Sequence, residues 1–262
     1  MKIELVIPTF NEEKKIGRCL ETLVGFFSAR NHLNCHVMVA DNGSTDGTYE
    51  IAADWSSRHS LIHAVRISAK GRGRALKAAW SESTADILSY MDVDLSTGLD
   101  AFPIVVLALA QGDYDLATGS RLLPGARTER CLKRECLSRG YNALVKFVFN
   151  TRFSDAQCGF KAITRRAAHE LLPLVEDTQW FFDTELMVIA EKRGYRLFDY
   201  PVQWIENRDT RVRIWRTVFD DLMGVLRLRR NLRGVNNRQR SGKDQSENRP
   251  ASLTPPSLYH DT

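Results

Sequence analysis

Two aspartates, Asp92 and Asp94, end a short apolar run in the stretch "DILSYMDVD". Side chains two residues apart in an extended segment point the same way, so both carboxylates can face one ion. Oxygen ligands of this kind suit Mg²⁺ or Mn²⁺, which often join protein carboxylates to substrate phosphates. A solvated acidic turn would contain the same two residues, so the pair alone leaves a metal site and a turn both open.

Three other polar clusters contain residue types that could bind a nucleotide. They are "PTFNEE" at 8–13, "DNGSTDGT" at 41–48 and "KGRGRA" at 70–75. Asp41 could accept hydrogen bonds from a base or a ribose, although its glycine-containing stretch also suits a turn that caps a helix. In the third cluster the glycines let the backbone approach a ligand and the cations attract phosphate, but the spacing is not that of a Walker loop.

Short apolar runs alternate with helical patterns in the first part of the chain. Strands are predicted at 3–10, 35–40, 61–67 and 86–94, and helices at 11–30, 41–59 and 71–83. Asn11 is the expected N-cap of the first helix. Strands that are apolar on both faces and alternate with helices favour an α/β fold with a mostly parallel sheet. Because ligands of such sheets bind beyond the carboxyl ends of the strands, the four polar clusters are predicted to share one edge.

The composition is that of a globular protein. Of the 262 residues, 43% are hydrophobic and 26% are charged, and the length allows one or two domains. The longest apolar runs are shorter than the roughly 20 residues that span a bilayer, and "MKIELVIPTFNEE" is not a signal peptide. The five cysteines form no metal-binding spacing and are predicted to be free thiols. These features predict a cytoplasmic protein, or one that is peripheral on the cytoplasmic face of a membrane.

The end of the chain differs in charge from the rest. Residues 227–243 contain seven basic residues and no acidic one, and the proline-rich stretch after them predicts a disordered tail over 236–262. Residues 218–235 predict a basic amphipathic helix that could lie on an anionic membrane or pack on the core. Nucleic acid is not an expected partner, because aromatic residues are not interleaved with the basic run. The apolar side of the helix would consist of Val218, Leu222, Val225, Leu226 and Leu228, with Arg227, Arg229, Arg230 and Arg233 beside it.

The order of the four clusters resembles the nucleotide-sugar half of family 2 glycosyltransferases with the GT-A fold. Later stretches are similar to the polyprenyl-phosphate branch of that family, which contains dolichyl-phosphate mannose synthases and dolichyl-phosphate glucosyltransferases. The resemblance spans roughly residues 3–215 and implies a Rossmann-like, mostly parallel sheet flanked by helices, as a GT-A catalytic domain over 1–217. The later stretches are "GSR" at 119–121, "RECLS" at 134–138, "DAQCGFK" at 155–161 and "WFFDTEL" at 180–186.

The resemblance also implies a role for individual residues. Those expected to bind the nucleotide sugar are Pro8, Thr9, Asn11, Glu12, Asp41, Ser44, Asp46, Gly71, Arg72, Asp92 and Val93. Those expected to hold the metal are Asp92, Asp94 and Ser96. Those expected to bind the acceptor phosphate are Arg121, Arg134, Ser138 and Arg208, since arginine can pair with phosphate through two N–H groups. Those expected to be catalytic are Asp94, Asp155, Asp183 and Glu185.

The activity implied is a metal-dependent, inverting transfer of glucose or mannose from UDP-glucose or GDP-mannose to a polyprenyl phosphate, with Mg²⁺ or Mn²⁺. A phosphate monoester is mostly anionic near neutral pH and needs little help from a general base. The alternative is a soluble family 2 enzyme with a saccharide or small-molecule acceptor. A hydroxyl acceptor would require a base, for which Asp155 and Asp183 are the candidates, whereas the pair Asp183 and Glu185 could instead orient sugar hydroxyls or support an arginine.

Overall fold

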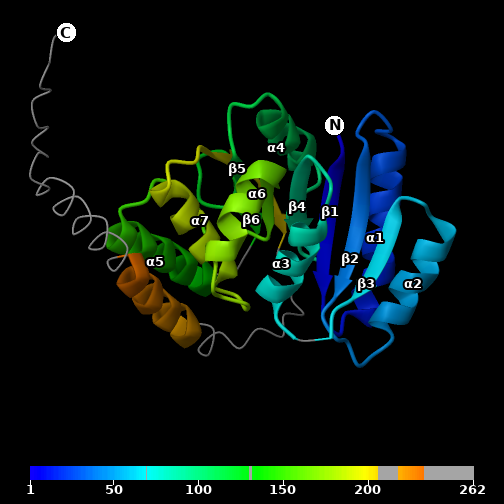
Figure 1. Cartoon of the computed structure of the whole chain (residues 1–262), viewed down its shortest axis with the longest axis horizontal. Coiled ribbons are helices and arrows are strands. Elements are labelled where there is room, and N and C mark those ends of the chain that lie inside the picture. Colours follow the sequence, from blue (N-terminus) through cyan, green and yellow to red (C-terminus); the bar gives the residue numbers. More distant parts are fainter. Residues whose placement is uncertain (69, 130–131, 206–217, 233–262) are drawn as a thin grey trace, which may run out of the picture.

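A computed structural model describes residues 1–68, 70–129, 132–205 and 218–232 (Figure 1). The strands are β1 (Ile3–Thr9), β2 (Cys35–Asp41), β3 (Ile62–Arg66), β4 (Ile87–Met91), β5 (Leu116–Ser120), β6 (Arg127–Glu129), β7 (Phe160–Thr164), β8 (Leu197–Pro201) and β9 (Gln203–Ile205). The α-helices are α1 (Glu13–Ser28), α2 (Thr48–Arg58), α3 (Arg72–Glu82), α4 (Ala101–Ala110), α5 (Leu132–Phe149), α6 (Arg165–Leu171) and α7 (Phe182–Lys192). The 3₁₀ turn η1 spans Leu172–Leu174. A further helix over 218–232 is called the C-terminal helix below.

Within these described residues, seven strands form one sheet in the order β3-β2-β1-β4-β7-β5-β8. The pairs β2–β3, β1–β2, β1–β4 and β5–β8 are parallel, whereas β7 runs antiparallel to both β4 and β5. The sheet is therefore mostly parallel, and the predicted α/β fold is confirmed. The short strands β6 and β9 form a separate parallel pair.

Alternating side chains of the strands supply two cores, one on each face of the sheet. Leu5 and Ile7 of β1 join one core with the apolar faces of α1, α2 and α4. Val6, between them, joins the other core, which is built from α3, α5, α6, α7 and the C-terminal helix. This double covering explains why the central strands β1, β4 and β5 are buried along almost their whole length.

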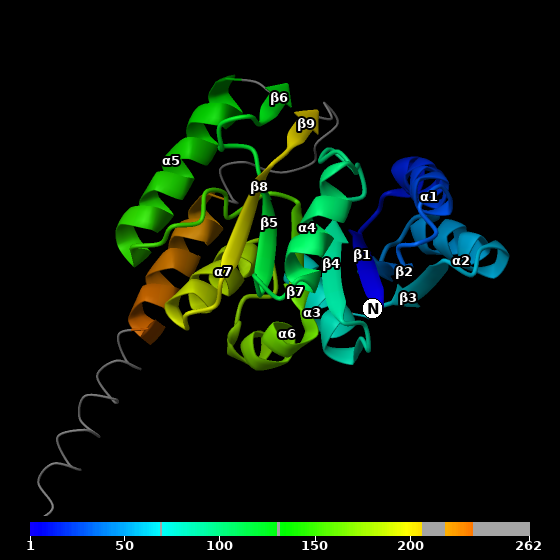
Figure 2. The same cartoon turned by 90° about the horizontal axis from the view of Figure 1, so that it is seen from above.

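The C-terminal helix packs on the body of the protein beside α5, as both views show (Figures 1 and 2). Val225 and Leu228 are buried in the core, at 3% and 2% exposure. Gly224 permits this contact, because a Cβ at that position would lie 2.5 Å from the ring of Phe181. The sequence left open whether this helix lies on a membrane or packs on the core, and its inner face packs on the core. The predicted tail over 236–262 lies outside the described residues.

The strand ends gather the polar clusters at one edge of the sheet. Residue 9 ends β1, residue 41 ends β2, and Asp92 follows β4 directly. Because β7 is antiparallel, its first residue, Phe160, pairs with Met91 at the end of β4. The stretch 155–159 is thereby placed at the same edge, although it lies more than sixty residues further along the chain.

Candidate active site

The loops after β1 and β2 are joined by hydrogen bonds. Asn11 has a left-handed backbone (φ 56°), its N–H donates to Ser44 Oγ at 2.9 Å, and its side-chain oxygen accepts from Thr45 N at 2.8 Å. The prediction that Asn11 caps α1 is wrong: the helix begins at Glu13, without a side-chain cap. The Glu12 N–H donates to Thr48 Oγ1 at 2.8 Å, and Asp46 accepts from Thr48 N. These contacts make the two loops a fixed rim.

Two buried oxygen atoms in this rim have no hydrogen-bond partner within the described residues: Asp41 Oδ1 and Thr9 Oγ1. The other carboxylate oxygen of Asp41 accepts from Ser44 N at 3.2 Å and lies 3.6 Å from Arg66 Nε. A buried acceptor without a donor is costly, and a base N–H or a ribose hydroxyl would supply one. Pro8, directly before Thr9, is the penultimate residue of β1.

Residues 70–74 comprise the two residues before α3 and the first turn of that helix, and this segment is called the donor loop below. The Gly71 N–H donates to Asn42 Oδ1 at 3.0 Å, and Gly71 has a φ of 149°. Arg72 then forms ion pairs with two carboxylates, Nη2 to Asp92 Oδ1 at 2.9 Å and Nη1 to Asp183 Oδ2 at 2.5 Å. Its guanidinium also lies over the ring of Trp180, 5.1 Å from the centroid. Arg72 therefore joins the donor loop, the end of β4 and the start of α7.

The two carboxylates beside Arg72 differ in pKa. Burial raises the pKa of Asp92, and the charge of Arg72 offsets this only in part. Burial also acts on Asp183, but Arg72, Lys161 and a 2.6 Å hydrogen bond from Tyr90 outweigh it and hold the pKa of Asp183 below its usual range. Asp183 is thus an ionised group with several partners, which makes it a weak proton acceptor.

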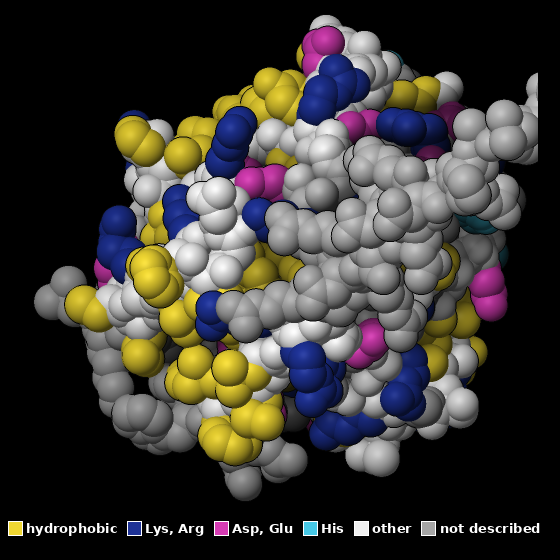
Figure 3. Space-filling model, turned by 60° about the vertical axis from the view of Figure 1, so that its left-hand side comes forward, with side chains coloured by type: hydrophobic (Ala, Val, Ile, Leu, Met, Phe, Trp, Pro, Cys, Tyr) yellow, Lys and Arg dark blue, Asp and Glu magenta, His cyan; other side chains and the backbone are white. Residues whose placement is uncertain are grey.

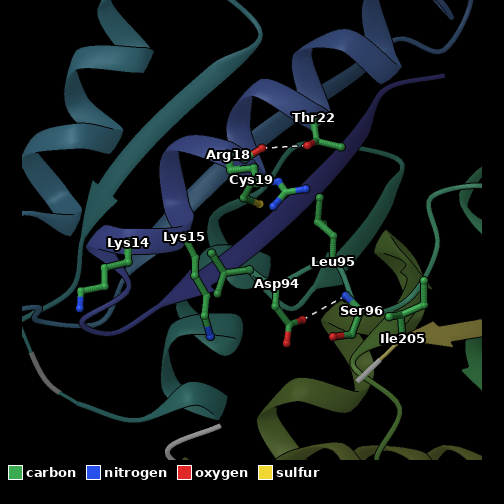
Figure 4. A pocket seen from close by; sticks show the side chains of 10 residues that line it. Lys14, Lys15, Arg18, Cys19, Thr22, Asp94, Leu95, Ser96 and Ile205 are labelled. Atoms are coloured by element: carbon green, nitrogen blue, oxygen red, sulfur yellow. Dashed lines mark hydrogen bonds between the residues drawn. The ribbon is translucent and has the colours of Figure 1, made fainter. Parts of the chain in front are cut away.

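Asp94 faces a cavity of about 480 Å³ (Figure 4). Its Oδ1 accepts from Ser96 N at 3.1 Å, and Leu95 between them has a left-handed backbone (φ 47°) that branched residues rarely adopt. The strained turn places both Asp94 and Ser96 on the cavity wall. The cavity is lined by Lys14, Lys15, Arg18, Cys19, Thr22, Val93, Asp94, Leu95, Ser96 and Ile205.

This cavity fits a divalent ion and an anionic ligand together. Lys14, Lys15 and Arg18 of α1 also line it, and positive charge of this kind attracts phosphate. Asp94 and the hydroxyl of Ser96 are oxygen donors of the kind Mg²⁺ and Mn²⁺ accept. Asp92 differs from Asp94 because both of its carboxylate oxygens lie close to other protein atoms. Arg72 donates to its Oδ1, and its Oδ2 lies so close to Gly159 that a Cβ there would be 1.9 Å away. In the part of the chain that the structure describes, no group of three or more His, Cys, Asp or Glu side chains gathers as a metal cluster.

Arg121 and Asp155 form a buried pair next to this site. Arg121 donates through Nε to Asp155 Oδ2 at 2.7 Å and through Nη2 to Oδ1 at 2.9 Å. Burial alone would raise the pKa of Asp155, but Arg121 outweighs it and lowers that pKa. The guanidinium stacks on Trp204, which leads to Ile205 of the cavity. Asp155 therefore supports an arginine, in the way that Asp183 supports Arg72.

The other predicted acceptor residues are less well placed by the structure. Ser138 Oγ is buried on α5 without a hydrogen-bond partner among the described residues. Asn142, one turn later, donates to Ser138 O and accepts from Ala156 N at 2.9 Å, which brings α5 against the 155–159 stretch. Arg208 and the side chain of Arg134 lie outside the described residues.

Two residues that the sequence analysis did not assign to the site, Arg227 and Asp221, take part in this region. Arg227 of the C-terminal helix lies 3.1 Å from Glu185 Oε2, so the buried Glu185, which was predicted to be catalytic, forms an ion pair with this helix. Asp221, 3% exposed, accepts from Gln157 Nε2 at 2.7 Å. Burial, with like charges nearby, raises the pKa of Asp221 to about 7. The only sequence signal was an acidic pair, Asp220 and Asp221, at the start of a basic helix.

The sequence model of "Glycosyl transferase family 2" matches residues 4–172, which include β1 to β7 and most of the site described above. The chain belongs to glycosyltransferase family 2. The strand-end clusters thereby gain a common explanation, and the resemblance drawn from the motifs is confirmed.

Curated relatives of this family 2 glycosyltransferase include two that are more than 30% identical. Glycosyltransferase AglD of Haloferax volcanii is 36% identical over 230 residues, which cover 86% of this chain and 36% of that protein. Dolichyl-phosphate beta-glucosyltransferase ALG5C of Trichomonas vaginalis is 31% identical, over 80% of this chain and 65% of its own length. The Drosophila melanogaster dolichyl-phosphate beta-glucosyltransferase is 28% identical, over 79% and 68%. The chain thus spans about a third to two thirds of these relatives.

Solved structures confirm the GT-A fold of this family 2 glycosyltransferase. Glucosyl-3-phosphoglycerate synthase from Mycobacterium tuberculosis, in complex with Mn²⁺, UDP and glucosyl-3-phosphoglycerate, has a TM-score of 0.65 at 17% identity. The match covers 87% of this chain and 79% of that one. The Mn²⁺ and UDP-glucose complex of the same enzyme gives a TM-score of 0.63 at 18% identity. At these identities the likeness concerns the fold.

Proposed function

We propose that this chain transfers glucose from UDP-glucose to a polyprenyl phosphate, with inversion at the anomeric carbon and with Mn²⁺ or Mg²⁺. The observation that carries the proposal is the state of the two candidate bases. Asp155 and Asp183 are each ionised and held by an arginine, with lowered pKa values. A hydroxyl acceptor needs a base whose pKa is near the working pH, whereas a phosphate monoester is already an anion. The dolichyl-phosphate glucosyltransferases among the relatives support the same acceptor and favour glucose.

The chemistry would proceed as a single displacement. An oxygen of the acceptor phosphate attacks the anomeric carbon, a new C–O bond forms, and the bond from that carbon to the nucleoside diphosphate breaks on the opposite face. A bound divalent ion would stabilise the negative charge that grows on the departing diphosphate. Asp94 and Ser96 would hold the ion, and Lys14, Lys15 and Arg18 would add positive charge along the same cavity.

The other residues bind and orient. Asp41 and Thr9 would accept hydrogen bonds from the nucleoside. The fixed rim around the nucleoside would be formed by Asn11, Glu12, Ser44 and Asp46. Ion pairs with Asp92 and Asp183 fix the position of Arg72 in the donor loop. From there Arg72 would face the phosphates of the nucleotide sugar. Asp155 orients Arg121 by accepting hydrogen bonds from its Nε and Nη2, and the guanidinium would bind the acceptor phosphate through Nη1. Arg134, Ser138 and Arg208 remain proposed partners of that phosphate.

The test is a transfer assay with labelled UDP-glucose and GDP-mannose, with and without a short polyprenyl phosphate, in Mn²⁺ or Mg²⁺. We expect label from UDP-glucose to enter an organic-extractable product, and much less from GDP-mannose. Transfer of label to a soluble saccharide or small molecule, with no lipid product, would overturn the polyprenyl phosphate as acceptor. The chain would then be a family 2 enzyme with a soluble acceptor. Predominant use of GDP-mannose would overturn the donor assignment.

We also propose that the outer face of the C-terminal helix docks on an anionic membrane. Val225 and Leu228, which were predicted for the apolar side, face the core instead, because they pack against it. The residues that face outward are Phe219, Leu222, Met223 and Leu226, at 64%, 42%, 52% and 58% exposure. At 100° per residue these four share one side of the helix, and the exposed Arg229 and Arg230 follow them in its last turns.

The neighbouring helix, α5, also exposes a large apolar side chain. Phe147 of α5 is 88% exposed, and Figure 3, which turns this side of the molecule towards the reader, shows clusters of hydrophobic side chains with Lys and Arg between them. Apolar side chains beside cations suit the interface of a membrane with anionic lipids. In the ranges that the structure describes, no helix is long and apolar enough to cross a bilayer.

Vesicle sedimentation tests the docking. Wild-type protein is expected to sediment with vesicles that contain phosphatidylserine. Arg229→Gln with Arg230→Gln should weaken binding roughly 30-fold, since each cation near such a surface contributes about 1 kcal/mol. Leu222→Gln with Leu226→Gln should also weaken it, and Arg58→Gln, on the distant α2, is the control. Equal sedimentation of all four proteins would remove this proposal and leave the transfer reaction untouched.

A further inference from the structure

The inner face of the C-terminal helix holds a carboxylate pair. Arg227 Nη2 lies 3.2 Å from Asp177 Oδ2 and 3.1 Å from Glu185 Oε2. The same oxygen of Glu185 accepts the Asp177 N–H at 2.7 Å. The side chain of Glu185 is 1% exposed and that of Asp177 13% exposed, so both charges depend on Arg227 for compensation.

Asp177 connects this pair to the donor loop. Its Oδ1 accepts the Gln179 N–H at 2.7 Å. The carbonyl oxygen of Gln179 accepts the Gly73 N–H at 3.2 Å, and that of Thr178 accepts the Arg74 N–H at 3.1 Å. A short series of hydrogen bonds therefore leads from Arg227 through residues 177–179 to the backbone of the donor loop.

The contact between these segments is also sterically tight. A Cβ at Gly71 would lie 2.5 Å from the carbonyl oxygen of Thr178, and one at Gly73 would lie 2.6 Å from Phe182 Cβ. Trp180 stacks on the guanidinium of Arg72 at 5.1 Å. Residues 177–182 thus cannot move towards the donor loop without displacing it, and movement away would break the hydrogen bonds from Gly73 N and Arg74 N.

We infer that Arg227 is a positioning residue for the donor loop, acting through Asp177 and residues 178–180. Without its guanidinium, the buried carboxylate of Glu185 and the partly buried carboxylate of Asp177, which share a hydrogen-bond network, would repel each other. The segment that holds Gly71, Arg72 and Gly73 would then relax. The inference rests on the proposed function only in taking the donor loop as part of the nucleotide-sugar site. It assigns to the C-terminal helix an effect on donor binding that is separate from any membrane contact.

The experiment measures nucleotide binding by calorimetry, with UDP and Mn²⁺ and without lipid. Arg227→Gln is expected to weaken UDP binding on the order of tenfold and to raise the KM for UDP-glucose by a similar factor, since about 1.4 kcal/mol corresponds to tenfold. The KM for polyprenyl phosphate should stay within twofold. Arg227→Lys, which keeps the charge, should recover part of the loss. Arg229→Gln is the matched control: it removes the same charge from the same helix at an exposed position and should bind UDP like the wild type.

A purely structural role predicts a different result. Arg227→Gln would then lower the Tm while the folded protein bound UDP within twofold of the wild-type Kd, and that outcome would overturn the inference. If Arg227→Gln does not fold, Asp177→Ala takes its place, because it removes both the ion pair with Arg227 and the hydrogen bond to Gln179 N through which the effect would reach the donor loop. A tenfold loss of UDP affinity is expected, and UDP binding by Asp177→Ala within twofold of the wild type would overturn the inference. Failure of the wild type to bind UDP or GDP would instead overturn the proposed function, and this inference with it.

Discussion

Asp94→Asn is expected to reduce turnover on the order of a thousandfold or more while the fold stays intact. Asp94 is the carboxylate on the wall of the cavity, which three cations also line, and its Oδ1 accepts one backbone N–H at 3.1 Å. Asparagine can keep that hydrogen bond, because its side-chain oxygen also accepts. It cannot supply the negative charge that binds a divalent ion, and such an ion contributes several kcal/mol to the stabilisation of a leaving diphosphate.

Three measurements separate this role from a structural one. The label-transfer assay gives turnover, the thermal melt gives stability, and electron paramagnetic resonance of Mn²⁺ in the presence of UDP gives metal binding directly. Asp94→Asn should lose the bound Mn²⁺ signal and keep the wild-type Tm. Asp100→Asn, an exposed aspartate six residues further along the chain, should match the wild type in all three. Turnover of Asp94→Asn within tenfold of the wild type would remove Asp94 from the metal site.

The sequence was a good guide to the elements and to the edge at which they place the site. The four predicted strands became β1 to β4, in parallel register, and the residues after β1, β2 and β4 lie at one edge of the sheet. These predictions succeeded because apolar runs and their alternation with helical patterns are local signals in the sequence. The edge at which ligands bind then follows from the parallel arrangement of the strands alone.

The partners of the charged residues could not be read in the same way. Arg72 and Asp183 are more than a hundred residues apart in the chain, and they meet only because α7 packs against α3 beside the end of β4. The pairing of Arg121 with Asp155 depends on β7 running antiparallel, which brings the 155–159 stretch back to the site. Such pairs are set by tertiary packing, for which a single sequence has no periodic signal.

The C-terminal helix shows a second limit. Its apolar residues cover more than one side, since Val225 and Leu228 face the core whereas Leu222 and Leu226 face outward. Sequence alone suggested one apolar stripe containing all four. A glycine, Gly224, was the available hint that one side of the helix makes a close contact, and Phe181 is what it contacts. Which side that is became clear only from the packing.

Asp155→Asn is the second prediction with a large effect, and here the effect is on stability. The Asp155 side chain is fully buried and that of Arg121 is 11% exposed, and they form a fork of hydrogen bonds at 2.7 and 2.9 Å. Removing one charge of a buried pair leaves the other uncompensated, at a cost of about 3–5 kcal/mol. For a chain of this size we expect the Tm to fall by about 10 °C. Asp54→Asn is the control, because it breaks an ion pair with Arg58 that is more than half exposed and should change stability by less than about 1 kcal/mol.

The pH dependence of the same variant decides between support and catalysis. The pKa of Asp155 is lowered in the folded protein relative to its ordinary value of 3.8, so its stabilisation is fully present above that value and is lost as the pH falls through the lowered pKa. The Tm difference between wild type and Asp155→Asn should therefore be constant from neutral pH down to about pH 5 and shrink below pH 4. A general base would behave otherwise: the variant would keep the wild-type Tm and lose only turnover. That result would reopen a hydroxyl acceptor, because an unpaired Asp155 could then remove its proton.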